Sequence, residues 1–150
     1  MKLRSQWIDK MAFSAEAGEL SVSMDAKPPL GSGSALTPKE LVLAGLCGCT
    51  GMDVVALLKK FKQPLASLEI EAEGVSKEVG HPVTFREINL LFRFQGAIDK
   101  EKALEAVRLS QSKYCSVSAM LSKALPINYE VQLNAESIGF GQADFSGGDA

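Results

Sequence analysis

The residues of this chain best suited to chemistry are its cysteines, Cys47, Cys49 and Cys115. The first two lie in a long apolar segment, LVLAGLCGCTGMDVVALLKK, at residues 41–60, and the third lies in KYCSVSAM at residues 113–120. A cysteine thiolate is a nucleophile that oxidants convert to a sulfenic acid, which a second thiol then converts to a disulfide. Cys49 and Cys115 therefore indicate thiol redox chemistry that needs no bound cofactor.

The reactivity of Cys49 depends on what surrounds it. A thiol attacks only as its thiolate, and burial raises the pKa of a thiol, so Cys49 requires a nearby cation or hydrogen-bond donors. In a helix, Asp53 would lie one turn away, where its charge opposes ionisation. One remedy is that Asp53 holds an arginine that faces the thiolate. The sequence leaves the choice of arginine open among Arg4, Arg86, Arg93 and Arg108.

Cys115 has the more favourable local setting for ionisation. It follows an expected break between two helices, so it should lie near a helix N-terminus, where the helix dipole stabilises a thiolate. The hydroxyl groups of Ser116 and Ser118 are further possible donors. Cys47, in contrast, is interpreted as a small buried packing residue, because free cysteine commonly has that role.

A zinc site is the alternative chemical interpretation. The three cysteines and the single histidine, His81, would supply a Cys3His ligand set. Residues two apart on a helix point about 200° away from each other, so Cys47 and Cys49 cannot hold one ion if their segment is helical. His81 lies in a Gly-His-Pro turn that we expect to be solvated. We therefore expect neither a metal nor a cofactor.

Length, composition and charge limit the class of protein. The chain has 150 residues, is 46% hydrophobic and carries a formal net charge of −2, which suits one soluble domain with its own core. The absence of a basic face argues against nucleic-acid binding. The first residues, MKLRSQW, hold no apolar run typical of a secretory signal, so we expect a cytoplasmic protein with free thiols.

The segment at residues 41–58 approaches the length of a membrane span. Asp53 interrupts it, three glycines weaken it, and lysines close it at residues 59 and 60. A helix that is apolar all round can also lie at the centre of a soluble core, and we expect that here rather than a membrane protein.

Periodicity predicts an α+β order of elements. Thr37, Pro38 and Glu40 have the types and spacing of a helix start. A Pro- and Gly-rich loop should precede it at residues 25–37, and we expect a domain at residues 1–135 followed by a mobile, Gly-rich tail at residues 136–150. The predicted strands are at residues 2–24, 68–79, 85–94 and 127–133, and the predicted helices are at 38–61, 99–112 and from 115 to before 126.

The central helix carries Gly45, Gly48 and Gly51 at intervals of three. Each glycine costs roughly 1 kcal/mol relative to alanine in a helix, so their repetition favours a smooth stripe for close helix packing over a helix break. One sheet can cover only one face of so apolar a helix. We therefore expect a second subunit to cover the rest, in an intertwined dimer.

Two segments, TPKELVLAGLCGCTGMDVVALLKK at residues 37–60 and SKYCSVSAML at residues 112–121, resemble the OsmC/Ohr family, and most closely its YhfA-like branch. The order of elements also agrees, so the resemblance extends over most of residues 1–135. It implies an OsmC-like α+β fold, with antiparallel sheets around a long buried central helix. It also implies an intertwined homodimer with two active sites at the interface.

The resemblance further implies an organic hydroperoxide reductase that acts in oxidative stress defence. Cys49 would attack the peroxide, Cys115 would resolve the sulfenic acid as a disulfide, and a lipoyl-type dithiol would reduce the pair. The alternative is a non-enzymatic OsmC-like protein that binds an apolar ligand or a partner at its dimer interface.

The sequence departs from the hydroperoxide reductases at two places. Those proteins carry a glutamate ten residues before the reactive cysteine, where this chain has Lys39, with Glu40 beside it. They also use an arginine from an early hairpin to activate the thiolate. In this chain Arg4 is the sole arginine among the first 85 residues, and Lys10 and Lys27 are the other local cations considered.

Overall fold

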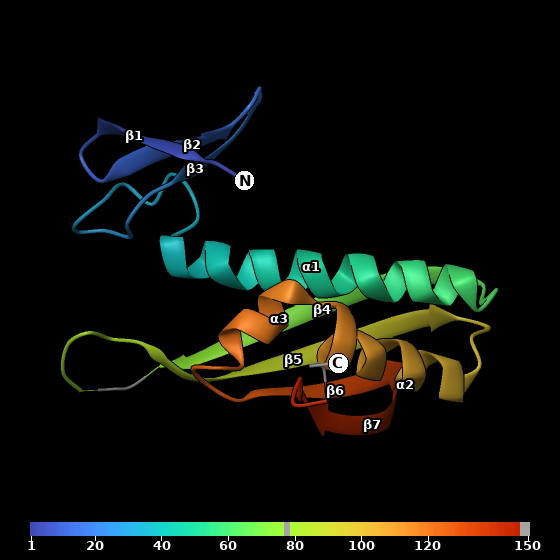
Figure 1. Ribbon diagram of the computed structural model, residues 1–150. Helices are drawn as coiled ribbons and strands as arrows, with labels where there is room; N and C mark the ends of the chain where they lie inside the picture. Colours follow the sequence, from blue (N-terminus) through green and yellow to red (C-terminus); the bar gives the residue numbers. More distant parts are fainter. Residues whose placement is uncertain (77–78, 148–150) are drawn as a thin grey trace. The chain divides into compact units, whose positions relative to one another are not determined.

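The computed structural model describes residues 1–76 and 79–147. Residues 77–78, near the end of the strand expected at 68–79, and residues 148–150, at the end of the expected tail, lie outside the described residues. The chain divides into two compact units, Met1–Ala44 and Gly45–Ala150. Each unit is described by itself below, and both are drawn in Figure 1.

The first unit is a small antiparallel sheet followed by a loop. Its three strands are β1 (Arg4–Asp9), β2 (Ala12–Ala17) and β3 (Leu20–Met24), paired in the order β1-β2-β3. The buried carboxylate of Asp25 organises the loop, because it accepts hydrogen bonds from the backbone N–H groups of Ser32 and Ser34 and from the Ser34 hydroxyl. Strands and loop both agree with the sequence prediction.

Helix α1 (Pro38–Lys60) begins at the predicted capping residues. The backbone N–H of Glu40 donates to Thr37 Oγ1 at 3.3 Å, and the backbone N–H of Thr37 donates to Glu40 Oε2 at 2.8 Å. Glu40 also pairs with Lys27 at 2.7 Å. The Lys27 ammonium and the Thr37 donors lower the pKa of Glu40 to about 2.

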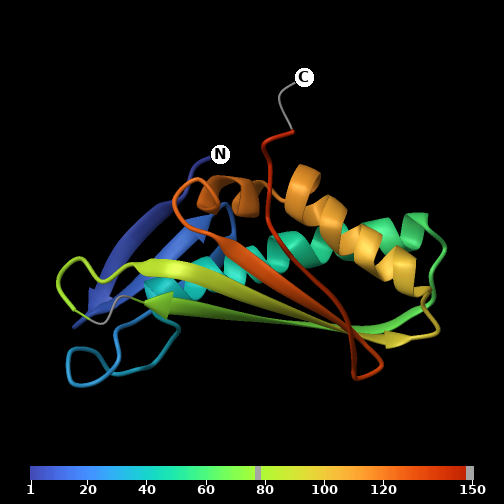
Figure 2. The ribbon, with the colours of Figure 1, turned by 90° about the horizontal axis from the view of Figure 1, so that it is seen from below.

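The second unit is a four-stranded sheet with helices on one face (Figure 2). The sheet has the order β4-β5-β6-β7, and its pairs are antiparallel except β5–β6, which is parallel. A parallel connection needs a crossover, and three helical segments supply it. The strands are β4 (Leu65–Ser76), β5 (Phe85–Gly96), β6 (Ile127–Leu133) and β7 (Glu136–Gln142), and the crossover contains α2 (Lys100–Leu109), a π-helix η1 (Ser110–Tyr114) and α3 (Ser116–Leu121).

Strand β7 corrects the expectation of a mobile tail, which is wrong for residues 136–142. This segment pairs with β6 along its length. Its glycines mark close packing rather than mobility: a Cβ at Gly139 would lie 2.6 Å from Leu104 Cδ2, and one at Gly141 would collide with the Tyr129 ring. Beyond the strand, the backbone N–H of Asp144 donates to the carbonyl of Gln111 in η1 at 3.0 Å.

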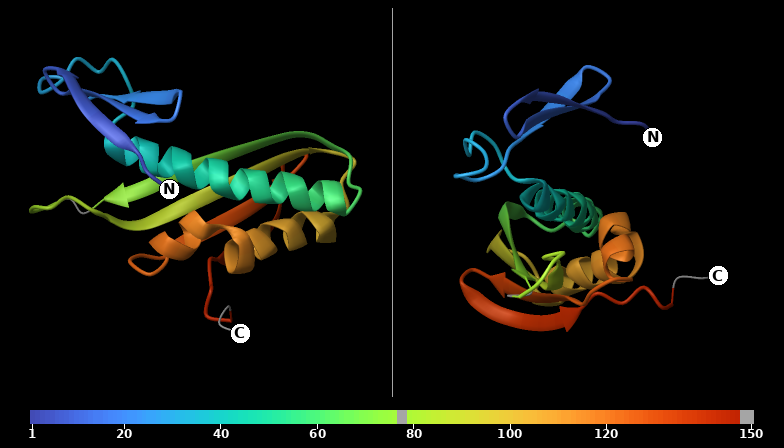
Figure 3. Two further views of the ribbon diagram at one scale, coloured as in Figure 1. Left: turned by 45° about the horizontal axis from the view of Figure 1, so that its top comes forward. Right: turned by 90° about the vertical axis from the view of Figure 1, so that its left-hand side faces the viewer.

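The core of this unit lies between the sheet and the helices. Alternate residues of β5, namely Ile88, Leu90, Phe92 and Phe94, are buried, and α1 and α2 lie on the same side of the curved sheet (Figure 3). Of α1, one face is buried, while Met52 is 76% exposed. The single chain thus covers one face of α1, as expected for one sheet, and the burial of the rest of the helix by a second subunit stays a prediction.

Candidate functional site

The site is built on the face of α1 that carries Cys49 and Asp53. These residues are four apart, so their side chains lie on the same face of the helix. The crossover brings Cys115 to them: the two sulfurs and a carboxylate oxygen of Asp53 all lie within 4.8 Å of one another. The Ser116 hydroxyl lies 3.9 Å from Cys49 Sγ. All three cysteines are free thiols in this structure.

The π-helix η1 and the start of α3 position Cys115. The backbone N–H of Cys115 donates to the Ser110 carbonyl at 3.0 Å, which closes the wide π turn. Cys115 then takes an extended conformation and caps α3, with its sulfur accepting the Ser118 N–H at 3.3 Å. The sequence prediction that Cys115 follows a helix break and begins a helix is confirmed.

A chain of buried hydrogen bonds joins the crossover to α1. The Ser118 hydroxyl donates to Gln111 Oε1 at 3.0 Å, and Gln111 Nε2 donates to Thr50 Oγ1 at 2.7 Å. Thr50 and Ser110 hydroxyls are 2.8 Å apart, and the Ser110 hydroxyl donates to Asp53 Oδ2 at 3.2 Å. Because Ser110 has one proton to donate, Thr50 is the donor in their shared bond. Every bond therefore points toward the Asp53 carboxylate, which is held in one orientation.

Cys49 is the thiol whose surroundings favour ionisation. Partial burial acts to raise the pKa of Cys49, but hydrogen bonds from the Val117 backbone N–H, the Cys115 thiol and the Ser116 hydroxyl outweigh it. The pKa of Cys49 is therefore lowered, even though the charge of Asp53 opposes this. The donors at the start of α3 thus stabilise the thiolate of Cys49 rather than that of Cys115.

Cys115 has the opposite tendency. Burial, together with the neighbouring Cys49 thiolate, raises the pKa of Cys115 to about 11, against the lowering effect of Ser118. The expectation that Cys115 has the more favourable setting is therefore wrong, because the effect of burial exceeds that of its place at a helix start. Cys115 remains a protonated thiol and donates a hydrogen bond to Cys49.

Asp53 does not hold an arginine in the part of the chain that the structure describes. Burial raises the pKa of Asp53, and its hydrogen-bond donor is Ser110. Of the four candidate arginines, Arg93 pairs instead with Glu69 and Glu71 on β4. Arg4 pairs with Glu16 in the first unit, at 3.2 Å. The groups that lower the pKa of Cys49 are therefore neutral donors.

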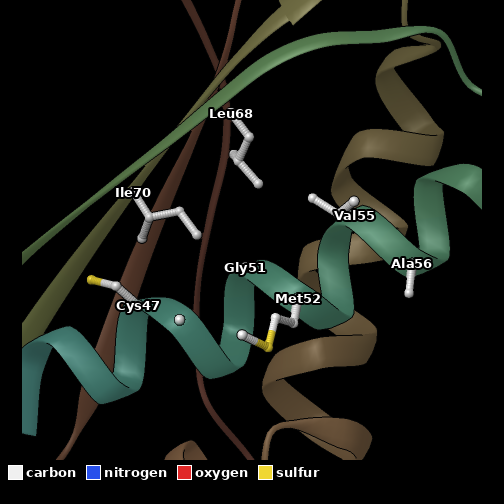
Figure 4. A pocket seen from close by; sticks show the side chains of 8 residues that line it. Cys47, Gly51, Met52, Val55, Ala56, Leu68 and Ile70 are labelled. Atoms are coloured by element: carbon white, nitrogen blue, oxygen red, sulfur yellow. The ribbon is translucent and has the colours of Figure 1, made fainter. Parts of the chain in front are cut away.

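Cys47 lies on another face of α1, beside an apolar cavity of about 660 Å³. Figure 4 shows Leu68 and Ile70 projecting from β4 toward the helix, where Gly51 leaves room for them. A Cβ at Gly51 would lie 3.2 Å from Ile70 Cδ1. Burial raises the pKa of Cys47, which agrees with a packing role.

Neither Cys47 nor His81 belongs to the group of Cys49, Asp53 and Cys115, the group of possible metal ligands within the described residues. The Cys3His ligand set considered from the sequence is therefore not assembled.

Comparisons with known proteins agree with this architecture. A family model described as OsmC-like protein matches residues 31–130. Protein YhfA of Escherichia coli (strain K12) is 34% identical over 137 residues, which cover 90% of this chain and 99% of that protein. The chain belongs to the OsmC-like family. The family resemblance inferred from the two cysteine segments is thus confirmed.

Solved structures confirm the fold. A hypothetical protein from Aquifex aeolicus is 27% identical, with a TM-score of 0.76 over 89% of this chain and 96% of its own. The organic hydroperoxide resistance protein OhrB of Bacillus subtilis is 19% identical, with a TM-score of 0.62 over 89% of this chain and 96% of its own.

Helix α1 is long and apolar enough to cross a membrane by length and composition alone. The protein is nevertheless a soluble member of this family, in which α1 belongs to the fold.

The sequence did not predict the series of hydrogen bonds that runs from Ser118 to Asp53. Thr50 carried a signal, because it is a polar residue in the otherwise apolar series formed with Leu46 and Val54 at helical spacing. Such a buried hydroxyl must find a partner. Gln111 carried a similar signal, because it lies four residues after Val107 and eight after Ala103, both buried apolar residues at helical spacing.

Proposed function

We propose that this protein is a cysteine-based reductase of organic hydroperoxides. The observation that carries the proposal is the pair of sulfurs within 4.8 Å of each other, with pKa values shifted in opposite directions. Cys49 has the lowered pKa that a nucleophile needs, and the protonated Cys115 lies within reach to resolve the product.

The proposed reaction has two steps in which atoms and electrons balance. The Cys49 thiolate attacks the distal oxygen of ROOH, the O–O bond breaks, and the products are Cys49 sulfenic acid and ROH after the alkoxide takes a proton. The Cys115 sulfur then attacks the Cys49 sulfur, forming a disulfide and releasing water. An external dithiol, for which a lipoyl-type dithiol is our candidate, reduces the disulfide by thiol–disulfide exchange and is itself oxidised.

Asp53 has a role in the second step. Cys115 must lose its proton as it attacks, and the carboxylate of Asp53 belongs to the same 4.8 Å group. Burial raises the pKa of Asp53, which makes its carboxylate a better proton acceptor. The bond from Ser110 holds this carboxylate in place. We assign Asp53 the role of general base for the resolving thiol.

Family membership supports the proposal. The fold is shared with a hydroperoxide resistance protein, although at 19% identity that likeness concerns the fold alone. The exposed apolar side chains of α1, Val42, Met52 and Val55, support the further proposal of an intertwined homodimer. We further propose that the protein is cytoplasmic and that it serves in oxidative stress defence.

A single-turnover experiment tests the proposed function. Reduced protein is mixed with cumene hydroperoxide, free thiols are titrated, and the peptides are mapped by mass spectrometry. We expect two thiols lost per peroxide and a Cys49–Cys115 disulfide. Cys115→Ser should lose one thiol and accumulate a Cys49 sulfenic acid that dimedone traps, because serine can keep the cap of α3. Unchanged thiol content in the wild-type protein would refute the proposal.

A second candidate function is the binding of an apolar ligand. The supporting observation is the cavity beside Cys47, whose lining includes Met52, Val55, Leu68 and Ile70. Cavities of this size and character are typical of small-molecule sites. Native mass spectrometry of the purified protein would test this candidate, and a copurifying apolar molecule released by Ile70→Trp would support it. A protein that purifies without a ligand and does not bind added fatty acids would count against this candidate.

A further inference from the structure

Two soft ligands and one hard ligand converge at the redox pair. The Cys49 and Cys115 sulfurs and an Asp53 oxygen lie within 4.8 Å of one another, although they come from α1 and from the junction of η1 and α3. Two thiolates at a tetrahedral zinc ion, each at about 2.3 Å, would lie about 3.8 Å apart. Closing the group around an ion thus needs an adjustment of at most about 1 Å, within reach of side-chain rotation.

The surroundings of these three ligands suit a metal as well as a redox reaction. Each sulfur accepts a backbone N–H, from Val117 for Cys49 and from Ser118 for Cys115. The Asp53 carboxylate accepts the Ser110 hydroxyl through Oδ2, and its other oxygen has no hydrogen-bond partner among the residues that the structure describes. Hydrogen bonds that orient the ligands in this way are a regular feature of metal sites.

The geometry points to a zinc site formed by Cys49, Cys115 and Asp53 in the reduced protein, with water as the fourth ligand. We propose that zinc bound there blocks the reaction with peroxide reversibly. Zinc is the preferred ion because it accepts thiolate and carboxylate ligands together and takes tetrahedral geometry. Binding exchanges the thiol protons for the ion, and these protons pass to solvent. The ligand set differs from the Cys3His set weighed from the sequence, since it omits Cys47 and His81.

Zinc and peroxide compete for the same sulfur lone pairs. While zinc holds Cys49, its thiolate is not free to attack, and once the disulfide forms, two of the three ligands are gone. The metal site therefore exists only in the reduced state. The site itself rests on geometry alone, whereas its effect on peroxide reduction rests on the proposed function.

Metal binding is tested without peroxide. The reduced full-length protein is titrated with Zn²⁺ in competition with a chromophoric chelator, and with Co²⁺ to observe thiolate-to-cobalt charge-transfer bands. We expect one ion per chain, and an affinity lower by at least about tenfold in Cys49→Ser and Asp53→Asn. The matched control is Cys47→Ser, two residues from Cys49 but outside the group, which should bind as the wild type does. Equal affinity in wild type and Cys49→Ser, or an equal loss in Cys47→Ser, would overturn the site.

Inhibition is tested separately. One equivalent of Zn²⁺ should stop the oxidation of the protein thiols by cumene hydroperoxide. Adding a chelator should restore this oxidation. Zinc binding with undiminished thiol loss would overturn the inhibitory role. Zinc binding in a protein that never reacts with peroxide would overturn the proposed function but leave the metal site intact.

Discussion

Two faces of α1 carry chemically identical thiols that differ in reactivity. On one face, Cys49 lies within 4.8 Å of Cys115 and Asp53 and has a lowered pKa. Cys47, two residues earlier, lies beside an apolar cavity, where burial raises its pKa. The helix, the residue type and the sequence neighbourhood are shared. The difference therefore comes from what each face meets, namely donors from α3 on one side and apolar side chains of β4 on the other.

The largest expected difference between Cys47 and Cys49 is in the effect of replacing each thiol by a hydroxyl. Cys49→Ser should lower the rate of peroxide-dependent thiol oxidation by at least about a thousandfold, because it removes the attacking atom. Cys47→Ser should change the rate by less than about twofold, because Cys47 is outside the reacting group. Stopped-flow thiol titration measures both. Comparable losses in the two variants would mean that the two faces are not functionally distinct.

The buried hydrogen bonds between α1 and the crossover should contribute more to stability than the exposed apolar side chain of Met52. Gln111→Leu would leave the Ser118 hydroxyl without its acceptor and would remove the N–H that Thr50 accepts, while Thr50 keeps its bond to Ser110. Unsatisfied buried groups cost about 1–3 kcal/mol each. Met52→Gln, at a side chain that is 76% exposed, should change the free energy of unfolding by less than about 0.5 kcal/mol. Urea denaturation of both variants gives the two values. A smaller cost for Gln111→Leu than for Met52→Gln would contradict the assignment.

Two glycines of α1, Gly48 and Gly51, line the cavity beside Cys47 but differ in the room around them. Gly48→Ala should stabilise the protein by up to about 1 kcal/mol, since no described atom lies within 4 Å of the added Cβ. Gly51→Ala should gain less, because its Cβ would lie 3.2 Å from Ile70 Cδ1. Thermal unfolding at matched concentrations measures the difference. Destabilisation by Gly48→Ala would show that the partner in the proposed homodimer packs closely against Gly48.

The smallest expected effect is a shift in pH dependence. The charge of Asp53 raises the pKa of Cys49, so Asp53→Asn should lower that pKa and move the midpoint of the alkylation rate to lower pH. Asparagine still offers an oxygen to Ser110, which preserves the geometry. Iodoacetamide labelling of the double variant Cys47→Ser/Cys115→Ser, with and without this change, isolates Cys49, because the chain has three free cysteines. The control Glu73→Gln, on exposed β4 surface, should leave the midpoint in place, and a shift to higher pH in Asp53→Asn would refute the electrostatic assignment.

The sequence was sufficient for the elements but not for the distances between them. Residues Thr37 and Glu40 specify the start of α1 through local hydrogen bonds, and local interactions can be read from spacing. The pairing of Cys49 with Cys115 was available through the family resemblance. Their approach to within 4.8 Å was not, because it depends on a crossover that folds back over α1.

The errors have a common physical origin in tertiary packing. Strand β7 was interpreted as a tail because Gly139 and Gly141 are typical of mobile segments, whereas here they make room for Leu104 and Tyr129. The sequence also favours ionisation of Cys115 over Cys49, whereas in the structure Cys49 has the lowered pKa and Cys115 the raised one. Burial of Cys115 and the donors beside Cys49 belong to the assembled fold, and no residue spacing encodes them.

The π-helix at Ser110–Tyr114 has a consequence at the level of the gene. A π turn differs from an α turn by one residue, so it corresponds to a single codon. Without that residue, α2 would run on as an ordinary helix and each later side chain would rotate by about 100°. The resolving cysteine would then face another direction although no residue of the site had changed. An insertion or deletion in this five-residue segment therefore acts on the proposed active site more strongly than most substitutions within it.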